Sequence, residues 1–165
     1  MSKVEEIIAI RASPAQAMRA LVTASRLPEW VAPDVTLTPL TRAATFGPGD
    51  RLRLRILGGP SFDYSVEAAS DREIVLSFTG PWSGQERWSF IADGAETIAR
   101  RTYEVQDASG LAGLAWPTLG RALVMAHYKL ELMRFRDMVE RDPGAAGEIE
   151  PGIGEVHTNY DVDER

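Results

Sequence analysis

The residues best suited to chemistry are a glutamate and an arginine on two strands that the sequence predicts to be neighbours. Asp93-Gly94 is typical of a two-residue hairpin turn, and it joins the segments 85–91 and 97–105. This turn pairs Glu86 with Arg101 on the face that the apolar residues mark as inward. A buried arginine needs a carboxylate partner, because an unpaired buried charge is costly. The pair is therefore either a structural ion pair or a polar anchor for a ligand.

Other catalytic or metal-binding groups are few. His127 is the only histidine before the C-terminal segment, and no nucleophile motif accompanies it. His127 and Glu131 stand four residues apart and could share a metal, but two ligands do not complete a site. The chain has no cysteine and no glycine-rich phosphate loop after a strand. We expect no metal and no cofactor.

Charge divides the 165-residue chain into two parts. Residues 143–165 carry six acids and one base, so they account for −5 of the net charge of −6. We expect residues 1–142 to form one nearly neutral domain and 143–165 to be a disordered acidic tail. Neither part has the basic surface that nucleic-acid binding needs. No apolar run is long enough to span a membrane and no signal peptide is evident, so a cytoplasmic protein is expected.

The elements alternate in an order that predicts a meander of antiparallel strands followed by a helix. Ser13-Pro14-Ala15-Gln16 has the N-cap, proline and glutamine of a capping box, which starts a short helix. A second helical turn ends at Leu27-Pro28-Glu29-Trp30, and an apolar loop at 111–117 precedes a long helix over about 118–141. Seven strands are predicted, at 3–11, 35–40, 51–57, 62–69, 73–79, 85–91 and 97–105.

The alternation of apolar and polar residues in the predicted strands 51–57 and 62–69 shows which side chains share a face. The apolar residues share a face if the connecting loop is Gly58-Gly59-Pro60, which pairs Leu54 with Tyr64. On the outer face the predicted neighbours are then Arg55 with Asp63 and Arg51 with Glu67. We interpret the row of arginines as a solvated, salt-bridged surface, and a patch for phosphate or an acidic ligand is the alternative.

The long helix has two apolar stripes on nearly opposite sides. One comprises Met125, Tyr128, Leu132, Phe135 and Val139, and we expect it to face the sheet. The other comprises Leu119, Leu123, Ala126, Leu130 and Met133. We expect the second stripe to pack under the 111–117 loop. The alternative is an exposed partner surface, including a homodimer through Leu119, Leu123 and Leu130.

The opening and the end of this pattern resemble one known superfamily. The stretch from Ile10 to Leu21, the Leu27-Pro28-Glu29-Trp30 turn, and a helix with Leu132-Met133-Arg134-Phe135 are similar to START-like (SRPBCC) proteins. The likeness is to the polyketide cyclase/dehydrase and lipid-transport group, over about residues 3–142. It implies an α+β helix-grip fold, in which a seven-stranded sheet wraps around the C-terminal helix. It also implies a protein that binds or carries small apolar molecules, although some members are cyclases or dehydratases.

A pocket between the helix and the concave sheet follows from this reasoning. Glu86 and Arg101 are its predicted polar groups, and Trp30, Trp82 and the 111–117 loop its mouth. The predicted apolar and aromatic lining is Leu54, Tyr64, Val66, Trp88, Tyr103, Tyr128, Leu132 and Phe135. Three functions remain open: a binder or carrier of a lipid- or polyketide-like molecule, a cofactor-free cyclase or dehydratase, and a protein-interaction module. In the enzyme, Arg101, Glu86, Tyr64 or Tyr103 would polarise a carbonyl or move a proton.

Overall fold

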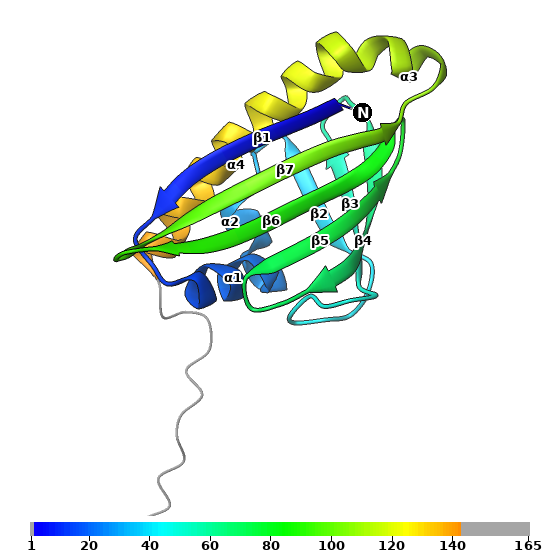
Figure 1. Cartoon of the computed structure of the whole chain (residues 1–165). Helices are drawn as coiled ribbons and strands as arrows, with labels where there is room; N and C mark the ends of the chain where they lie inside the picture. The colour runs from blue at the N-terminus through cyan, green and yellow to red at the C-terminus, as the bar shows by residue number, and fades with distance from the viewer. Residues whose placement is uncertain (1, 143–165) are drawn as a thin grey trace, which may run out of the picture.

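A curved seven-stranded antiparallel sheet wraps around a long C-terminal helix in the computed structural model, which describes residues 2–142 (Figure 1). The predicted helix-grip architecture is confirmed. The expected tail, 143–165, lies outside the described residues. The strands are β1 (Ser2–Ile10), β2 (Val35–Pro39), β3 (Arg51–Ile56), β4 (Ser61–Ala69), β5 (Glu73–Thr79), β6 (Ser83–Asp93) and β7 (Glu96–Asp107). Their order in the sheet is β1-β7-β6-β5-β4-β3-β2, so the first strand pairs with the last.

Short helices cover one end of the concave face, at α1 (Pro14–Val22), a 3₁₀ turn (Ala24–Arg26) and α2 (Leu27–Trp30). The predicted capping box of α1 is confirmed. The amide of Gln16 donates to Ser13 Oγ at 3.1 Å, and the amide of Ser13 donates to Gln16 Oε1 at 2.9 Å. This start directs the apolar face of α1 into the core, where Met18 and Leu21 are buried.

The C-terminal helical segment starts earlier than predicted. The stretch expected to be an apolar loop is helical, as α3 (Gly110–Ala115) followed by a π-helical turn, η2 (Trp116–Gly120). The long helix α4 (Arg121–Arg141) continues directly from that turn. Because 111–117 extends the helix instead of folding back over it, this segment cannot cover the second apolar stripe. Leu119, Leu130 and Met133 are accordingly exposed. On the first stripe, Met125 is also exposed, whereas Tyr128, Leu132, Phe135 and Val139 are buried.

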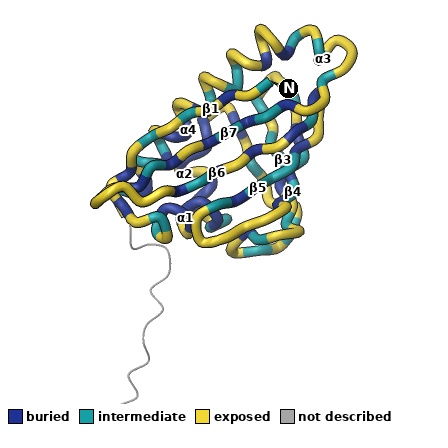
Figure 2. Tube along the Cα trace, viewed as in Figure 1, coloured by how far each residue is buried: buried dark blue, intermediate teal, exposed yellow. Residues whose placement is uncertain are grey.

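The strand faces are as predicted, but the registers of the β3–β4 and β6–β7 hairpins are each shifted by two residues. Leu54 pairs with Phe62, not Tyr64, because the three-residue loop is Leu57-Gly58-Gly59 with Gly58 at φ +68°. The predicted outer pairs Arg55–Asp63 and Arg51–Glu67 are therefore wrong. Arg53 binds Asp63 instead, with Nε 2.6 Å from Oδ1, and Glu67 accepts a hydrogen bond from Ser77. The arginines of β3 still alternate with Leu52 and Leu54, which line the first cavity, and so lie on the outer face. Figure 2 shows the alternation of buried and exposed positions along the strands of the sheet.

The β6–β7 hairpin shows the same displacement. Gly94 occupies the first position of the two-residue loop, with φ +61°, and Asp93 pairs with Glu96. A glycine in first position is typical of a type II′ turn, whereas the prediction placed it second. As a result Arg101 pairs with Trp88, and Glu86 pairs with Tyr103. Glu86 and Arg101 are diagonal neighbours rather than directly opposite, and they remain on the concave face.

The outer Arg53–Asp63 pair gives a first prediction. Both side chains are more than one third exposed, so solvent screens their attraction. We expect Asp63→Asn to leave the urea midpoint of unfolding almost unchanged. A large decrease in that midpoint would show that the arginine row is more than a solvated surface.

Candidate functional site

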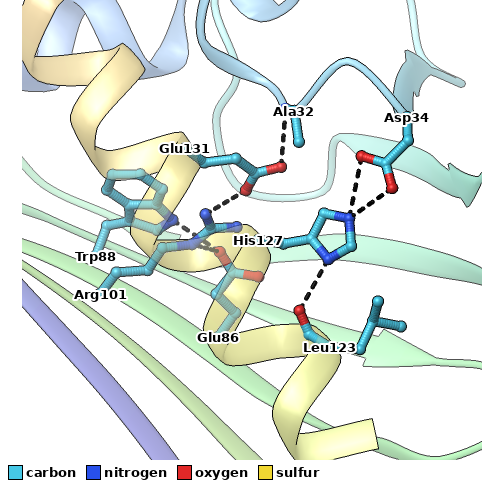
Figure 3. A network of polar contacts seen from close by, with 8 residues as sticks. All are labelled: Ala32, Asp34, Glu86, Trp88, Arg101, Leu123, His127 and Glu131. Atoms are coloured by element: carbon cyan, nitrogen blue, oxygen red, sulfur yellow. Dashed lines mark hydrogen bonds and ion pairs between the residues drawn. The ribbon is translucent and has the colours of Figure 1, made fainter. Parts of the chain in front are cut away.

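The centre of the concave face holds a buried arginine between two glutamates. Arg101 on β7 has its Nε 2.7 Å from Glu86 Oε1 on β6, and its Nη1 donates to Glu131 Oε2 on α4 (Figure 3). All three residues are buried. The predicted contact between Glu86 and Arg101 is confirmed, and the structure adds Glu131 as a second partner. The network joins two strands of the sheet to the helix.

Each glutamate is also held by a second donor. Glu86 Oε1 accepts a hydrogen bond from Trp88 Nε1 at 2.8 Å, so one oxygen accepts from both Trp88 and Arg101. Glu131 Oε1 accepts from the backbone amide of Ala32 at 3.1 Å. Buried carboxylates with several donors are held in one orientation, which fixes the guanidinium that they contact.

Aromatic rings enclose the guanidinium. The Arg101 Cζ lies 3.6 Å from the ring centroid of Tyr128, 4.6 Å from that of Trp88 and 5.8 Å from that of Trp30. Burial alone would lower the pKa of Arg101, but Glu86, Tyr128 and Glu131 raise it well above its usual range. The site thus keeps a permanent cation in an apolar surrounding.

Two small cavities adjoin this network. One of about 60 Å³ is lined by residues of both short helices and of β2–β7, among them Trp30, Val66, Glu86 and Trp88. The other, of about 40 Å³, lies against α4 and is lined by Tyr103, His127, Tyr128 and Glu131 among others. Three residues line both cavities: Leu54, Tyr64 and Arg101. These three side chains therefore form the partition between the two spaces.

The predicted pocket residues fall into two groups. Leu54, Tyr64, Val66, Trp88, Tyr103, Tyr128, Glu86, Arg101 and Trp30 line one or both cavities. Leu132, Phe135 and Trp82 line neither. Phe135 is fully buried and packs against Trp30 and Trp88, with ring centroids 5.9 Å and 5.4 Å away. Trp82 is buried beside Trp116 and donates to Tyr103 Oη at 2.8 Å. Their role in ligand binding stays a prediction.

The three tyrosines of the cavities remain protonated donors. Burial raises the pKa of Tyr64 and Tyr128 well above its ordinary value, and nearby Glu86 raises it further. Burial also raises the pKa of Tyr103. Each hydroxyl therefore keeps its proton, and that of Tyr128, which has no partner within residues 2–142, is free to donate a hydrogen bond to a ligand.

His127 on α4 contacts the carboxylate of Asp34, which lies in the loop between α2 and β2. His127 Nδ1 lies 2.8 Å from the carbonyl oxygen of Leu123, and Nε2 lies 2.9 Å from Asp34 Oδ2. Both neighbours are acceptors, so the contacts are satisfied together only by the doubly protonated ring. Glu131 points to Arg101 instead of joining His127 (Figure 3). Between residues 2 and 142, no three potential metal ligands of the His, Cys, Asp or Glu type are grouped.

The His127–Asp34 contact predicts a window of pH in which it stabilises the fold. Burial alone would lower the pKa of His127, but the hydrogen bond to Asp34 raises it above 6.5, and the same bond lowers the pKa of Asp34 below 3.8. The histidine contribution is complete below pH 6.5 and is lost as pH rises through the raised pKa. The aspartate contribution is present above pH 3.8 and is lost as pH falls through the lowered pKa. Besides Asp34, the charged group that acts on His127 is Glu131.

We expect His127→Gln to lower stability at about pH 6 more than at about pH 9. Urea unfolding of both proteins at the two pH values measures this difference. An equal loss of stability at both values would show that the ring is neutral in the native protein.

The exposed side of α4 is the surface predicted to bind a second copy of the chain. Leu119 and Leu130 are exposed and Leu123 is half-buried, so the predicted homodimer surface is open to solvent. Nothing in the single chain tests whether a second copy binds there, and the homodimer stays a prediction. No helix within residues 2–142 is long and apolar enough to span a membrane.

Comparison with known proteins supports the fold. No curated protein matches the chain in sequence. Among solved structures, the Zhui aromatase/cyclase from Streptomyces sp. R1128 is 16% identical, with a TM-score of 0.66 over 90% of this chain and 99% of that one. The Aha1 dimer from Colwellia psychrerythraea is 20% identical, with a TM-score of 0.65 over 85% and 97%. The protein TTHA0849 from Thermus thermophilus is 16% identical, with a TM-score of 0.66 over 84% and 97%.

The sequence itself matches a family model over most of its length. The match extends over residues 1–140. It therefore includes all the described strands and helices, except Arg141 at the end of α4, and the residues that line both cavities. The seven-stranded sheet, the short helices after β1 and the long C-terminal helix agree with it. The chain belongs to the family described as polyketide cyclase/dehydrase and lipid transport.

Proposed function

We propose that the protein binds a small, largely apolar molecule that carries a hydrogen-bond acceptor, between α4 and the concave sheet. One observation carries the proposal: the Arg101 guanidinium lines both cavities, and its Nη2 makes no hydrogen bond to any residue in the described part of the chain. A buried cation with a spare donor is ready to receive an oxygen atom of a ligand.

The surroundings support this proposal. The walls of the first cavity are mostly apolar and aromatic, with Glu86 and Arg101 as its charged residues. Apolar walls supply binding free energy through burial, and a few polar groups set the orientation. The family to which the chain belongs includes cyclases, dehydrases and lipid transporters, which all accommodate apolar molecules.

Cavity size limits the ligand. Volumes of about 60 Å³ and about 40 Å³ each exceed the roughly 10–15 Å³ that one water molecule needs, but they are far below those of pockets for drug-sized ligands. A larger ligand therefore has to open the partition made by Leu54, Tyr64 and Arg101. Leu54 is the residue to move, because it is half-buried and makes no polar contact.

A titration with acetophenone tests the proposal. This ketone offers one aromatic ring for the apolar walls and one carbonyl oxygen for a buried donor, and it is larger than either cavity, so its binding requires the partition to open. We expect saturable shifts of the methyl NMR signals of Leu54, Val66 and Leu76, which line the first cavity. The methyl signals of Ile7 and Ile91 are the matched control, because these side chains are exposed on the outer face.

Two results would contradict the proposal. The first is the absence of any saturable shift at the cavity methyl groups. The second is an equal shift at Ile7 and Ile91, which would indicate weak adsorption over the surface. The titration of Leu54→Ala adds a test of the partition, and we expect this variant to bind acetophenone more tightly than the parent.

A second candidate function is a cyclisation or dehydration without cofactor. Its specific support is that the donors Arg101, Tyr64 and Tyr103 and the carboxylates of Glu86 and Glu131 border the same cavities. A carboxylate would take a proton from the carbon next to one carbonyl. That carbon would then bond to a second carbonyl carbon, whose oxygen is polarised by these donors and receives the proton that the carboxylate took. The carboxylate would next take a second proton from the same carbon and return it to the new hydroxyl group, which leaves as water and leaves a carbon–carbon double bond.

Heptane-2,6-dione tests this candidate, because its internal aldol reaction and loss of one water molecule give a cyclic enone that absorbs in the ultraviolet. We expect the protein to accelerate enone formation, and Glu86→Gln to reduce the rate. A rate equal to that in buffer would leave binding as the function that the site supports.

A further inference from the structure

We infer that the site selects neutral ligands that carry hydrogen-bond acceptors and discriminates against carboxylates. This inference rests on the proposed function and defines its ligand class. It depends on two independent features of the cavities: the number of acidic groups around Arg101, and two buried donors that have no partner.

The first feature is an excess of carboxylates over cations in the buried network. Two carboxylates, Glu86 and Glu131, contact a single guanidinium, and all three side chains are at least 95% buried. Within residues 2–142 neither glutamate has an ion pair with another lysine, arginine or histidine. A ligand carboxylate would therefore be a third acid on one cation, and burial of the three side chains weakens the screening of the repulsion by solvent. A neutral carbonyl can accept from Arg101 Nη2 without adding charge.

The second feature is a pair of unsatisfied donors. Trp30 Nε1 and Tyr128 Oη are buried and have no hydrogen-bond partner in the described chain. Trp30 lines the first cavity and Tyr128 the second, and both rings flank Arg101. A buried donor without a partner costs stability, so both positions favour a molecule that brings an acceptor. An indole N–H can only donate, which excludes a ligand donor at that position.

Three probes with one benzene ring separate these effects. Acetophenone is neutral and has an acceptor, benzoate has acceptors and a negative charge, and ethylbenzene has neither. We expect the dissociation constant, measured by NMR titration at neutral pH, to be at least about tenfold larger for benzoate than for acetophenone. Ethylbenzene is expected to lie between the two, since it leaves the donors unpaired but adds no charge.

Glu86→Gln tests the excess of carboxylates with little change of shape. Glu86 Oε1 accepts from both Trp88 and Arg101, so a glutamine that presents its oxygen there retains both hydrogen bonds and loses only the charge. We expect this variant to reduce the preference for acetophenone over benzoate by about threefold or more. Glu73→Gln is the matched control, because Glu73 forms its ion pair with Arg87 on the exposed face. It should leave the preference unchanged.

Tyr128→Phe tests the unpaired donor. The substitution removes only the hydroxyl group. We expect it to raise the dissociation constant of acetophenone severalfold and to leave that of ethylbenzene unchanged. Equal losses for both probes would show that the hydroxyl does not meet the ligand.

The outcomes distinguish the two proposals. If none of the three probes binds, the proposed function fails. If the probes bind and benzoate binds as tightly as acetophenone, or if Glu86→Gln leaves the preference unchanged, the inference about ligand charge is overturned while the proposed function stands.

Discussion

Arg101→Met is expected to lower the free energy of unfolding by about 4 kcal/mol, one of the two largest effects that we predict for a single substitution. Methionine fills much of the space but leaves the carboxylates of Glu86 and Glu131 buried without a cation. It also removes the cation that lies over the ring of Tyr128. Urea unfolding monitored by circular dichroism measures the loss.

Rescue variants show whether the loss comes from uncompensated charge. Since there are two carboxylates, adding Glu86→Gln to Arg101→Met should restore only part of the stability. Adding Glu131→Gln as well should restore most of the stability that is still missing. Arg101→Lys should be intermediate, because an ammonium cannot reproduce two hydrogen bonds from separate guanidinium nitrogens. Full recovery with Glu86→Gln alone would show that Glu131 is not charged in the variant.

Gly84→Ala is expected to destabilise the protein by about 3 kcal/mol. A Cβ atom at this position would lie 1.9 Å from the carbonyl oxygen of Glu104 and 3.0 Å from the ring of Phe78. Gly84 lies at an irregularity where β6 and β7 change register, so neither strand can move without breaking its pairing. Thermal unfolding by calorimetry measures the effect.

Gly47→Ala is the matched control. A Cβ atom there meets nothing within 4 Å, and the backbone has no positive φ. We expect the free energy of unfolding to change by less than about 1 kcal/mol. The expected direction is a small increase, because alanine restricts the unfolded chain more than glycine does. Equal effects of the two substitutions would contradict the close approach of β6 and β7 at Gly84.

Much of the fold was predictable from local signals. The capping box at Ser13 and the short spacing between apolar alternations identified the first helix and the antiparallel strands. Alternation also assigned the inward faces, including those of Glu86 and Arg101. Each of these signals depends on a few consecutive residues, which is why it can be interpreted without a structure.

The hairpin registers were not predictable in the same way. A displacement by two residues keeps every side chain on its face, so alternation cannot distinguish Glu86 opposite Arg101 from Glu86 opposite Tyr103. The choice depends on whether Gly94 takes the first or second loop position, and both occur in hairpins. The ion pair formed nevertheless, because long side chains reach a diagonal neighbour.

Glu131 was the main omission from the predicted site. The sequence suggests it only as a possible metal ligand with His127, yet it follows Tyr128 by three residues and so lies on the sheet-facing side of α4. A glutamate on a buried helix stripe indicates a buried cationic partner, and Arg101 is that partner. The size of the cavities was beyond sequence reasoning, because it depends on how Trp30, Trp88 and Phe135 pack together.

The pairing of β1 with β7 has a consequence for synthesis on the ribosome. Residues Ser2–Ile10 are made before the rest of the sheet, their partners at Thr97–Val105 emerge only after most of the domain, and Phe135 on α4 emerges later still. Until then the inner side chains of β1 have no place in a closed core. Loop closure over such a long separation is slow, and the domain cannot complete its folding before β7 and α4 have emerged. The nascent chain therefore exposes an unpaired, partly apolar strand until β7 has emerged, and binding by a chaperone would protect that strand.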